Sequence, residues 1–129
     1  MESSTSIEQF QEDLQYWKQE LSSIKQEICH FENHLENMAK MKLSKIHLAT
    51  VEHFQNSFIC QKEVLDKLRH DLPDSQQKVQ HSFNMFNTAA KDAKHALAER
   101  MDTFRRIYNE IKQEFKQFRS SESLELASA

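Results

Sequence analysis

The chain has 129 residues, no glycine, one proline and a formal net charge of −3. Glycine supplies the positive φ angles of tight turns, so a chain without it holds few turns and long elements. The acidic charge argues against duplex nucleic acid as a main partner, since phosphate binding needs a basic face. No apolar run is long enough to span a bilayer, and two cysteines fit a reduced cytoplasmic location.

The first predicted helix covers residues 6–40. Its apolar residues alternate at steps of three and four, which is a heptad pattern. Thr5 or Ser6 can cap its start. The pattern fades over 39–44, so we expect a turn there with Ser44 as the N-cap of the next helix. The apolar positions of the first helix are Ile7, Phe10, Leu14, Trp17, Leu21, Ile24, Ile28, Phe31, Leu35 and Met38.

The second predicted helix covers residues 45–72. Pro73 ends it, because proline lacks an N–H and disfavours helix at the residue before it. Gln61 is the one polar residue at an inward position, where such a residue most often sets the register between helices. The inward positions are Val51, Phe54, Phe58, Gln61, Leu65, Leu68 and Leu72.

The third predicted helix covers residues 74–119, with Asp74 at its start, and 120–129 is expected to be a flexible C-terminal tail. The heptad pattern has one stutter, between Leu97 and Met101. Residues 1–119 therefore form a single domain. The inward positions of the third helix are Val79, Phe83, Phe86, Ala90, Ala93, Leu97, Met101, Phe104, Tyr108, Ile111, Phe115 and Phe118.

These elements predict an all-α, antiparallel three-helix bundle with coiled-coil-like seams and an overlong third helix. With turns near residues 42 and 73, the third helix runs beside the first at an offset of about 62 residues. Beyond Met101 it would then have no neighbour, and its large apolar side chains would be an exposed patch that monomers rarely tolerate. The alternative is a four-helix bundle with a break near 98–103. The predicted interface residues are Phe104, Ile107, Tyr108, Ile111, Phe115 and Phe118.

Seven histidines raise the question of a metal site, as in bundles of the hemerythrin or di-iron kind. The chain has one Glu-x-x-His motif, at Glu27 and His30, with His34 one turn further and His53 at a similar height. In the heptad frame these residues lie on flanks rather than in the core. We therefore assign no metal and no cofactor, and keep Glu27, His30, His34 and His53 as an alternative site.

Catalysis by a nucleophile needs a positioned base and an oxyanion hole, and long helices leave few free backbone N–H groups for one. The chain is therefore not expected to be an enzyme. A basic stretch from Arg105 to Arg119 could lie on an anionic membrane, but Glu110 and Glu114 interrupt it. Contact with a membrane surface is accordingly a second alternative that we do not expect.

Residues 51–56 and 61–72, which read VEHFQN and QKEVLDKLRHDL, resemble a stretch in small uncharacterised bacterial helical proteins. The resemblance covers the first two helices. It implies a helical bundle and a bacterial cytosolic origin, and it carries no function. From the residues themselves, the leading hypothesis is a non-enzymatic interaction or structural protein, either a homodimer or a partner of another helical protein.

Overall fold

Three helices make up the part of the chain that the structure describes. In this computed structural model the backbone is described for residues 2–72 and 87–128, and the side chains for 8–72 and 94–121. Helix α1 spans Glu2–Ala39, α2 spans Lys45–Asp71 and α4 spans Asn87–Ser128. These ranges contain no strand, and the helices pack together, so the predicted all-α three-helix bundle is confirmed.

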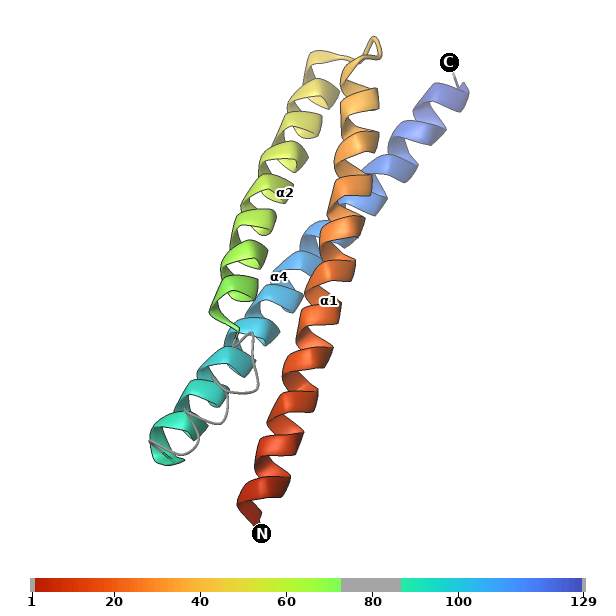
Figure 1. Ribbon diagram of the computed structural model, residues 1–129. Helices are drawn as coiled ribbons and strands as arrows, with labels where there is room; N and C mark the ends of the chain where they lie inside the picture. The colour runs from red at the N-terminus through yellow and green to blue at the C-terminus, as the bar shows by residue number, and fades with distance from the viewer. Residues whose placement is uncertain (1, 73–86, 129) are drawn as a thin grey trace.

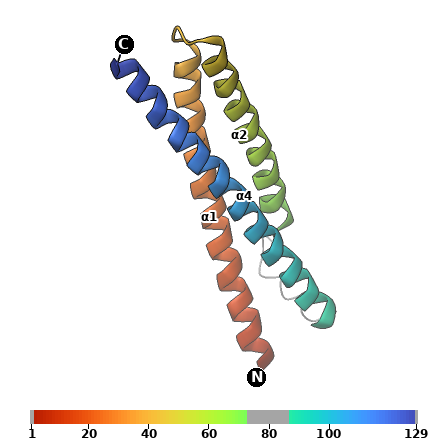
Figure 2. The same cartoon turned by 180° about the vertical axis from the view of Figure 1, so that it is seen from behind.

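Helices α1 and α2 form an antiparallel hairpin, and α4 crosses one face of it. Figure 1 shows α1 and α2 side by side and joined by the turn at 40–44, with α4 running obliquely past both. Seen from behind, in Figure 2, α4 lies in front of the pair. α4 runs in the direction of α1, so its C-terminal end lies at the same end of the bundle as the turn.

The turn between α1 and α2 follows the predicted chemistry. α1 ends at Ala39, and the N–H of Lys40 donates to the carbonyl oxygen of Asn37 at 3.2 Å. The Oγ atom of Ser44 accepts a hydrogen bond from the N–H of His47 at 3.3 Å. Ser44 therefore satisfies one of the free donors at the start of α2, and the predicted N-cap is confirmed.

The predicted end of α2 is also confirmed. Leu72 is extended, with φ −71° and ψ 135°, and its N–H donates to the carbonyl oxygen of Leu68 at 3.0 Å. A residue before proline is biased toward this conformation, because the proline ring clashes with a helical predecessor. Pro73 and the predicted cap Asp74 lie outside the described residues.

Other predicted boundaries were wrong. α1 begins at Glu2, so Thr5 and Ser6 lie inside the helix rather than at its cap. α4 continues to Ser128 instead of ending at 119, since residues 120–128 contain neither glycine nor proline and include good helix formers. α4 is continuous through 98–103, which removes the alternative break there. The predicted start of the third helix, over 74–86, falls outside the described residues.

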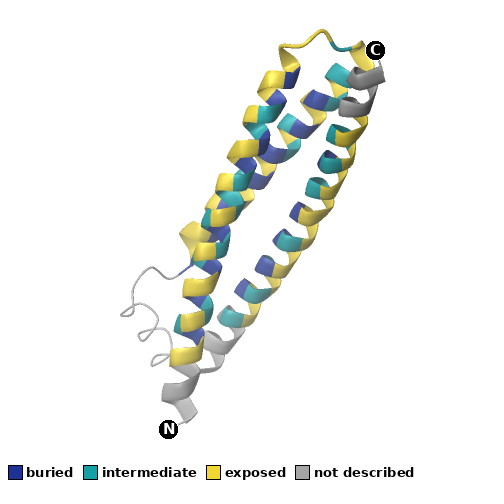
Figure 3. Ribbon diagram, turned by 90° about the vertical axis from the view of Figure 1, so that its right-hand side faces the viewer, coloured by how far each residue is buried: buried dark blue, intermediate teal, exposed yellow. Residues whose placement is uncertain are grey.

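The predicted inward positions are buried or partly buried wherever their side chains are described. Figure 3 shows the buried stripes of the helices facing one another, with the exposed residues outside. Ile24, Ile111 and Phe118 are partly buried and pack against the core. The buried positions are Phe10, Leu14, Trp17, Leu21, Ile28, Phe31, Leu35, Met38, Val51, Phe54, Phe58, Gln61, Leu65, Leu68, Leu72, Leu97, Met101, Phe104, Tyr108 and Phe115.

Phe115 of α4 joins all three helices. Its ring centroid lies 5.1 Å from that of Phe31 on α1 and 5.5 Å from those of Phe54 and Phe58 on α2. The side chain is completely buried. Tilted and edge-to-face contacts at such distances stabilise aromatic pairs beyond the burial of area alone. This aromatic layer fixes the position of α4 along the axis of the α1–α2 hairpin.

The register of α4 differs from the predicted one. Arg105 binds Glu20 across a sequence separation of 85 residues, and Tyr108 binds Glu27 across 81. The predicted offset was about 62 residues, so α4 is displaced by about 21 residues, or three heptads. A displacement by whole heptads leaves the same face of the helix inward, which is why the buried positions were right and the register was wrong.

The error comes from the predicted turn at Pro73. A tight turn there would put the neighbour of Asp71 near residue 75, by the geometry of antiparallel helices. In the structure the carboxylate of Asp71 accepts a hydrogen bond from Arg100 at 2.8 Å, 29 residues along the chain. The part of α4 that faces the end of α2 is thus much further along the chain than expected.

We expect Phe115→Ala to lower the free energy of unfolding by about 3–5 kcal/mol, because it leaves a cavity between all three helices. Urea denaturation followed by circular dichroism at about 222 nm measures the change. Tyr16→Ala is the matched control, since Tyr16 is 66% exposed. A loss of less than about 0.5 kcal/mol for Phe115→Ala, the size of a surface effect, would contradict this register.

Candidate functional site

The predicted interface on α4 is mostly covered within the chain. The expectation of a bare overhang is wrong, because the shift of register places α1 and α2 against this part of α4. Of the six predicted residues, Phe104, Tyr108 and Phe115 are buried, Ile111 and Phe118 pack against the core, and only Ile107, at 38%, is exposed.

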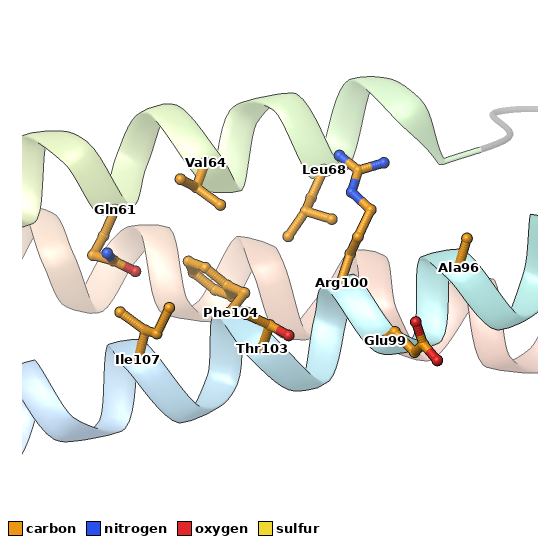
Figure 4. Close-up of a pocket in the computed structure, with 9 residues that line it drawn as sticks. All are labelled: Gln61, Val64, Leu68, Ala96, Glu99, Arg100, Thr103, Phe104 and Ile107. Atoms are coloured by element: carbon orange, nitrogen blue, oxygen red, sulfur yellow. The ribbon is translucent and has the colours of Figure 1, made fainter.

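A groove between α2 and α4 includes Phe104 and Ile107 of this surface. Its volume is about 430 Å³, and Figure 4 shows side chains from both helices pointing into it. An apolar recess with a few polar groups is the usual form of a binding site. The lining residues are Gln61, Val64, Leu68, Ala96, Glu99, Arg100, Thr103, Phe104 and Ile107.

Much of the lining of this groove is apolar. Leu68 and Phe104 are 1% and 2% exposed and belong to the core. Val64 and Ile107, on facing helices, are 47% and 38% exposed. Val64 is not at an inward position of α2, because Gln61, Leu65 and Leu68 occupy the inward positions in that part of the helix. The helical pattern of the sequence therefore gave no reason to single it out.

The two ends of the groove are polar. Gln61, only 8% exposed, lies at the end near Ile107 (Figure 4). At the other end Glu99 lies near Ala96, and Arg100 reaches across to Asp71 on α2. The heptad pattern predicted that Gln61 sets the register between helices. The structure places it in the lining of the groove.

Helices α1 and α4 are joined by charged side chains, which we call the acid–base ladder. The carboxylates on α1 are spaced seven residues apart and therefore share one face of the helix. Arg105 donates to both carboxylate oxygens of Glu20, a geometry that strengthens an ion pair. The ladder consists of Asp13–Lys94 at 3.5 Å, Glu20–Arg105 at 2.6 Å and Glu27–Lys112 at 2.8 Å.

Glu27 and Tyr108 form the most buried contact of the ladder. The hydroxyl of Tyr108 donates to the Glu27 carboxylate. Partial burial alone would raise the pKa of Glu27, but hydrogen bonds from Lys112 and Tyr108 outweigh it, so the pKa lies below its usual value. Burial and the neighbouring carboxylate together raise the pKa of Tyr108. Tyr108 therefore stays a neutral donor at any physiological pH.

His34 stands at the next heptad position after Glu27, where a carboxylate would continue the ladder. Its ring meets the edge of Phe115, with centroids 6.2 Å apart. Burial, Arg119 of α4 and His30 all lower the pKa of His34, since each disfavours its positive charge. The last attractive ion pair of the ladder is thus at Glu27, and one heptad further on the surroundings of His34 disfavour a positive charge.

The four residues of the alternative metal site are not brought together. The carboxylate of Glu27 is held by neighbours on α4. His30 is exposed, His34 packs on an aromatic ring, and His53 on α2 is exposed. Over the part of the chain that is described, no group of three or more histidine, cysteine, aspartate or glutamate side chains could hold a metal ion.

The basic stretch of α4 is largely engaged within the bundle. Arg105 and Lys112 bind carboxylates of α1, and the guanidinium of Arg119 lies 5.6 Å from the ring centroid of Phe115. These cations do not form a free basic face of the kind that binds a membrane surface. Among the described helices, none has a stretch apolar and long enough to cross a bilayer.

The chain was also compared with known proteins. No family model, no curated protein and no solved structure matches it.

We expect the bundle to lose stability as the pH falls below about 6.5, partly through His34. Its pKa is depressed in the folded state, so the unfolded chain takes up the proton first, and the stability present above the unfolded pKa is lost. His34→Gln should reduce the fall in the urea midpoint between about pH 7.5 and about pH 5.5. His95→Gln, at an exposed site of α4, is the control. An equal fall in wild type and His34→Gln would refute this role.

Proposed function

We propose that this protein is a non-enzymatic helical-bundle protein that works by association, two copies packing through the α2–α4 groove. The observation that carries the proposal is the exposure of Val64 and Ile107 beside a recess over Leu68 and Phe104. Contiguous apolar surface on a soluble domain commonly marks an interaction site, because covering it removes that surface from water.

The shape of the groove favours a second copy as the occupant. A two-fold interface uses the same surface on both copies, so that surface must hold both a projecting side chain and a space for it. Ile107 projects at one end of the groove, and the small Ala96 lies at the other (Figure 4). If the two α4 helices run antiparallel, Ile107 of each copy lies over Ala96 of the other, and large packs against small.

The polar ends of the groove support the same arrangement. The two-fold that places Ile107 over Ala96 also brings the Gln61 end of one copy to the Glu99 end of the other. The Gln61 amide then has a carboxylate to which it can donate. A satisfied polar pair within an apolar interface disfavours displaced pairings, since a shift would leave the amide without a partner.

This proposal differs from the sequence-based one in its surface. The predicted interface was the C-terminal half of the third helix, and most of its side chains are used inside the bundle. Ile107 remains available and Phe104 contributes the floor of the groove. Arg100 is the cationic side chain in the lining, and it is already paired with Asp71. A paired cation is more suited to binding than to catalysis.

Val64→Glu and Ile107→Glu test the proposal, because each puts a charge among the apolar side chains of the groove. We expect either change to raise the dimer dissociation constant at least about tenfold. Sedimentation equilibrium over a range of concentrations measures it. Ile59→Glu is the matched control, since Ile59 is 46% exposed on α2 but does not line the groove.

Two results would count against self-association through the groove. One is a wild-type protein that stays monomeric up to about 1 mM, since a dimer that weak has no specific interface. The other is an equal effect of Ile59→Glu and Ile107→Glu, which would move the contact to another face. Far-ultraviolet circular dichroism of each variant verifies that the helices remain intact.

A further inference from the structure

The turn end of the bundle carries apolar side chains that nothing in the described structure covers. Ile46, in the first turn of α2, is 78% exposed, more than any other large apolar side chain described. Met41, in the turn itself, is 47% exposed. Leu43 lies between them in sequence and packs against the core, so the turn is held to the bundle while its neighbours project outward.

The same turn is rich in positive charge. Lys40, Lys42 and Lys45 are all exposed. The sequence has no aspartate or glutamate between Glu36 and Glu52, although the whole chain has a net charge of −3. Glu36 approaches Lys40 only to 3.9 Å, with both side chains about two-thirds exposed. Such a pair neutralises little in water.

The position of the turn matters as much as its composition. Figure 1 shows the turn at the end of the two long helices, where it forms a narrow tip. Stable protein interfaces bury about 800 Å² on each partner, which needs a broader surface than a five-residue turn. A bilayer has no such requirement, since it adapts to a projecting tip and offers apolar and anionic layers a few ångströms apart.

We propose that this tip, residues 40–46, docks onto an anionic lipid surface. Lys40, Lys42 and Lys45 contact the headgroups, and Met41 and Ile46 enter the boundary between headgroups and acyl chains. Lysine suits this place because its long stem lies along apolar material while its ammonium stays in water. Basic residues near a negatively charged leaflet add attraction that falls with ionic strength.

This site is distinct from the basic stretch of α4, whose Arg105 and Lys112 are held by α1. It is also separate from the α2–α4 groove, because no residue of the tip lines that groove. The proposal therefore stands or falls independently of self-association. Its occupant follows from the charge of the tip, which is opposite to that of an anionic membrane.

Flotation of the full chain with lipid vesicles is the first test. We expect binding to phosphatidylcholine vesicles with about 30% phosphatidylserine, much less to pure phosphatidylcholine, and a decrease as salt is raised. Met41→Ser and Ile46→Ser should each weaken the partition about tenfold, because each removes an inserted apolar side chain. Tyr16→Ser is the matched control, since Tyr16 is 66% exposed but belongs to the middle of α1.

Fluorescence of a Met41→Trp variant is the second test. The native Trp17 is buried, so its emission should change little on binding. We expect the added tryptophan to shift its emission to the blue with anionic vesicles, as its ring leaves water. Replacing Lys40, Lys42 and Lys45 together by glutamine should abolish both the shift and the flotation.

Four outcomes would overturn the proposal. These are no flotation with anionic vesicles at low salt, equal flotation of wild type and Ile46→Ser, an equal loss in Tyr16→Ser, and an unshifted Met41→Trp emission in the presence of bound vesicles. A change in sedimentation of the tip variants without lipid would assign the tip to a protein contact instead. The variants alter exposed positions, so circular dichroism should show unchanged helix content.

Discussion

The placement of Phe115 between the other two helices is the interaction on which the rest of the structure depends. α1 and α2 are held as a hairpin by a short turn, but α4 has no such constraint in the described chain. Its height is set by one fully buried ring against Phe31, Phe54 and Phe58. The groove and the acid–base ladder both exist because α4 is held at that position along the hairpin.

The sequence predicted the faces of the helices well, because burial alone decides them. Seven-residue spacing identified the inward positions, Ser44 identified the start of α2, and Pro73 its end. The same spacing could not predict the register of α4. Since the apolar pattern repeats every heptad, positions three heptads apart bury nearly equivalent faces, and local rules do not separate them.

The charges do separate them, and this signal was present in the sequence. At the observed offset Glu20 meets Arg105 and Glu27 meets Lys112. Three heptads away, Glu20 would face Asn84 and Asp13 would face Pro73, neither of which offers a charge, whereas Glu27 would face another lysine, Lys91. A partly exposed ion pair contributes about 0.2–1 kcal/mol, so the loss of two such pairs changes the ratio of registers by up to about a factor of ten. Ladder matching, added to apolar matching, would have indicated the register.

The error in register had a direct consequence for the candidate site. In the predicted register the C-terminal half of the third helix extended beyond the other two helices. Its aromatic side chains were therefore expected to be exposed, and they became the predicted interface. With α4 in place they form the core, and the surface available for association is a groove that no periodic pattern marks. Val64 is not at an inward position of its helix, and Gln61 is a polar residue at an inward position. Both become meaningful only when two helices from distant parts of the chain are brought together.

The two proposed surfaces also constrain each other. The groove lies along the bundle, whereas the lysine-rich tip is at its end (Figure 1). A two-fold pairing with antiparallel α4 helices directs the tips of the two copies to opposite ends. With α1 about 57 Å long at 1.5 Å per residue, both tips cannot lie on one flat membrane. A monomer would therefore bind one membrane through its single tip. A dimer would bring two membrane surfaces together, so that self-association would turn membrane binding into membrane tethering.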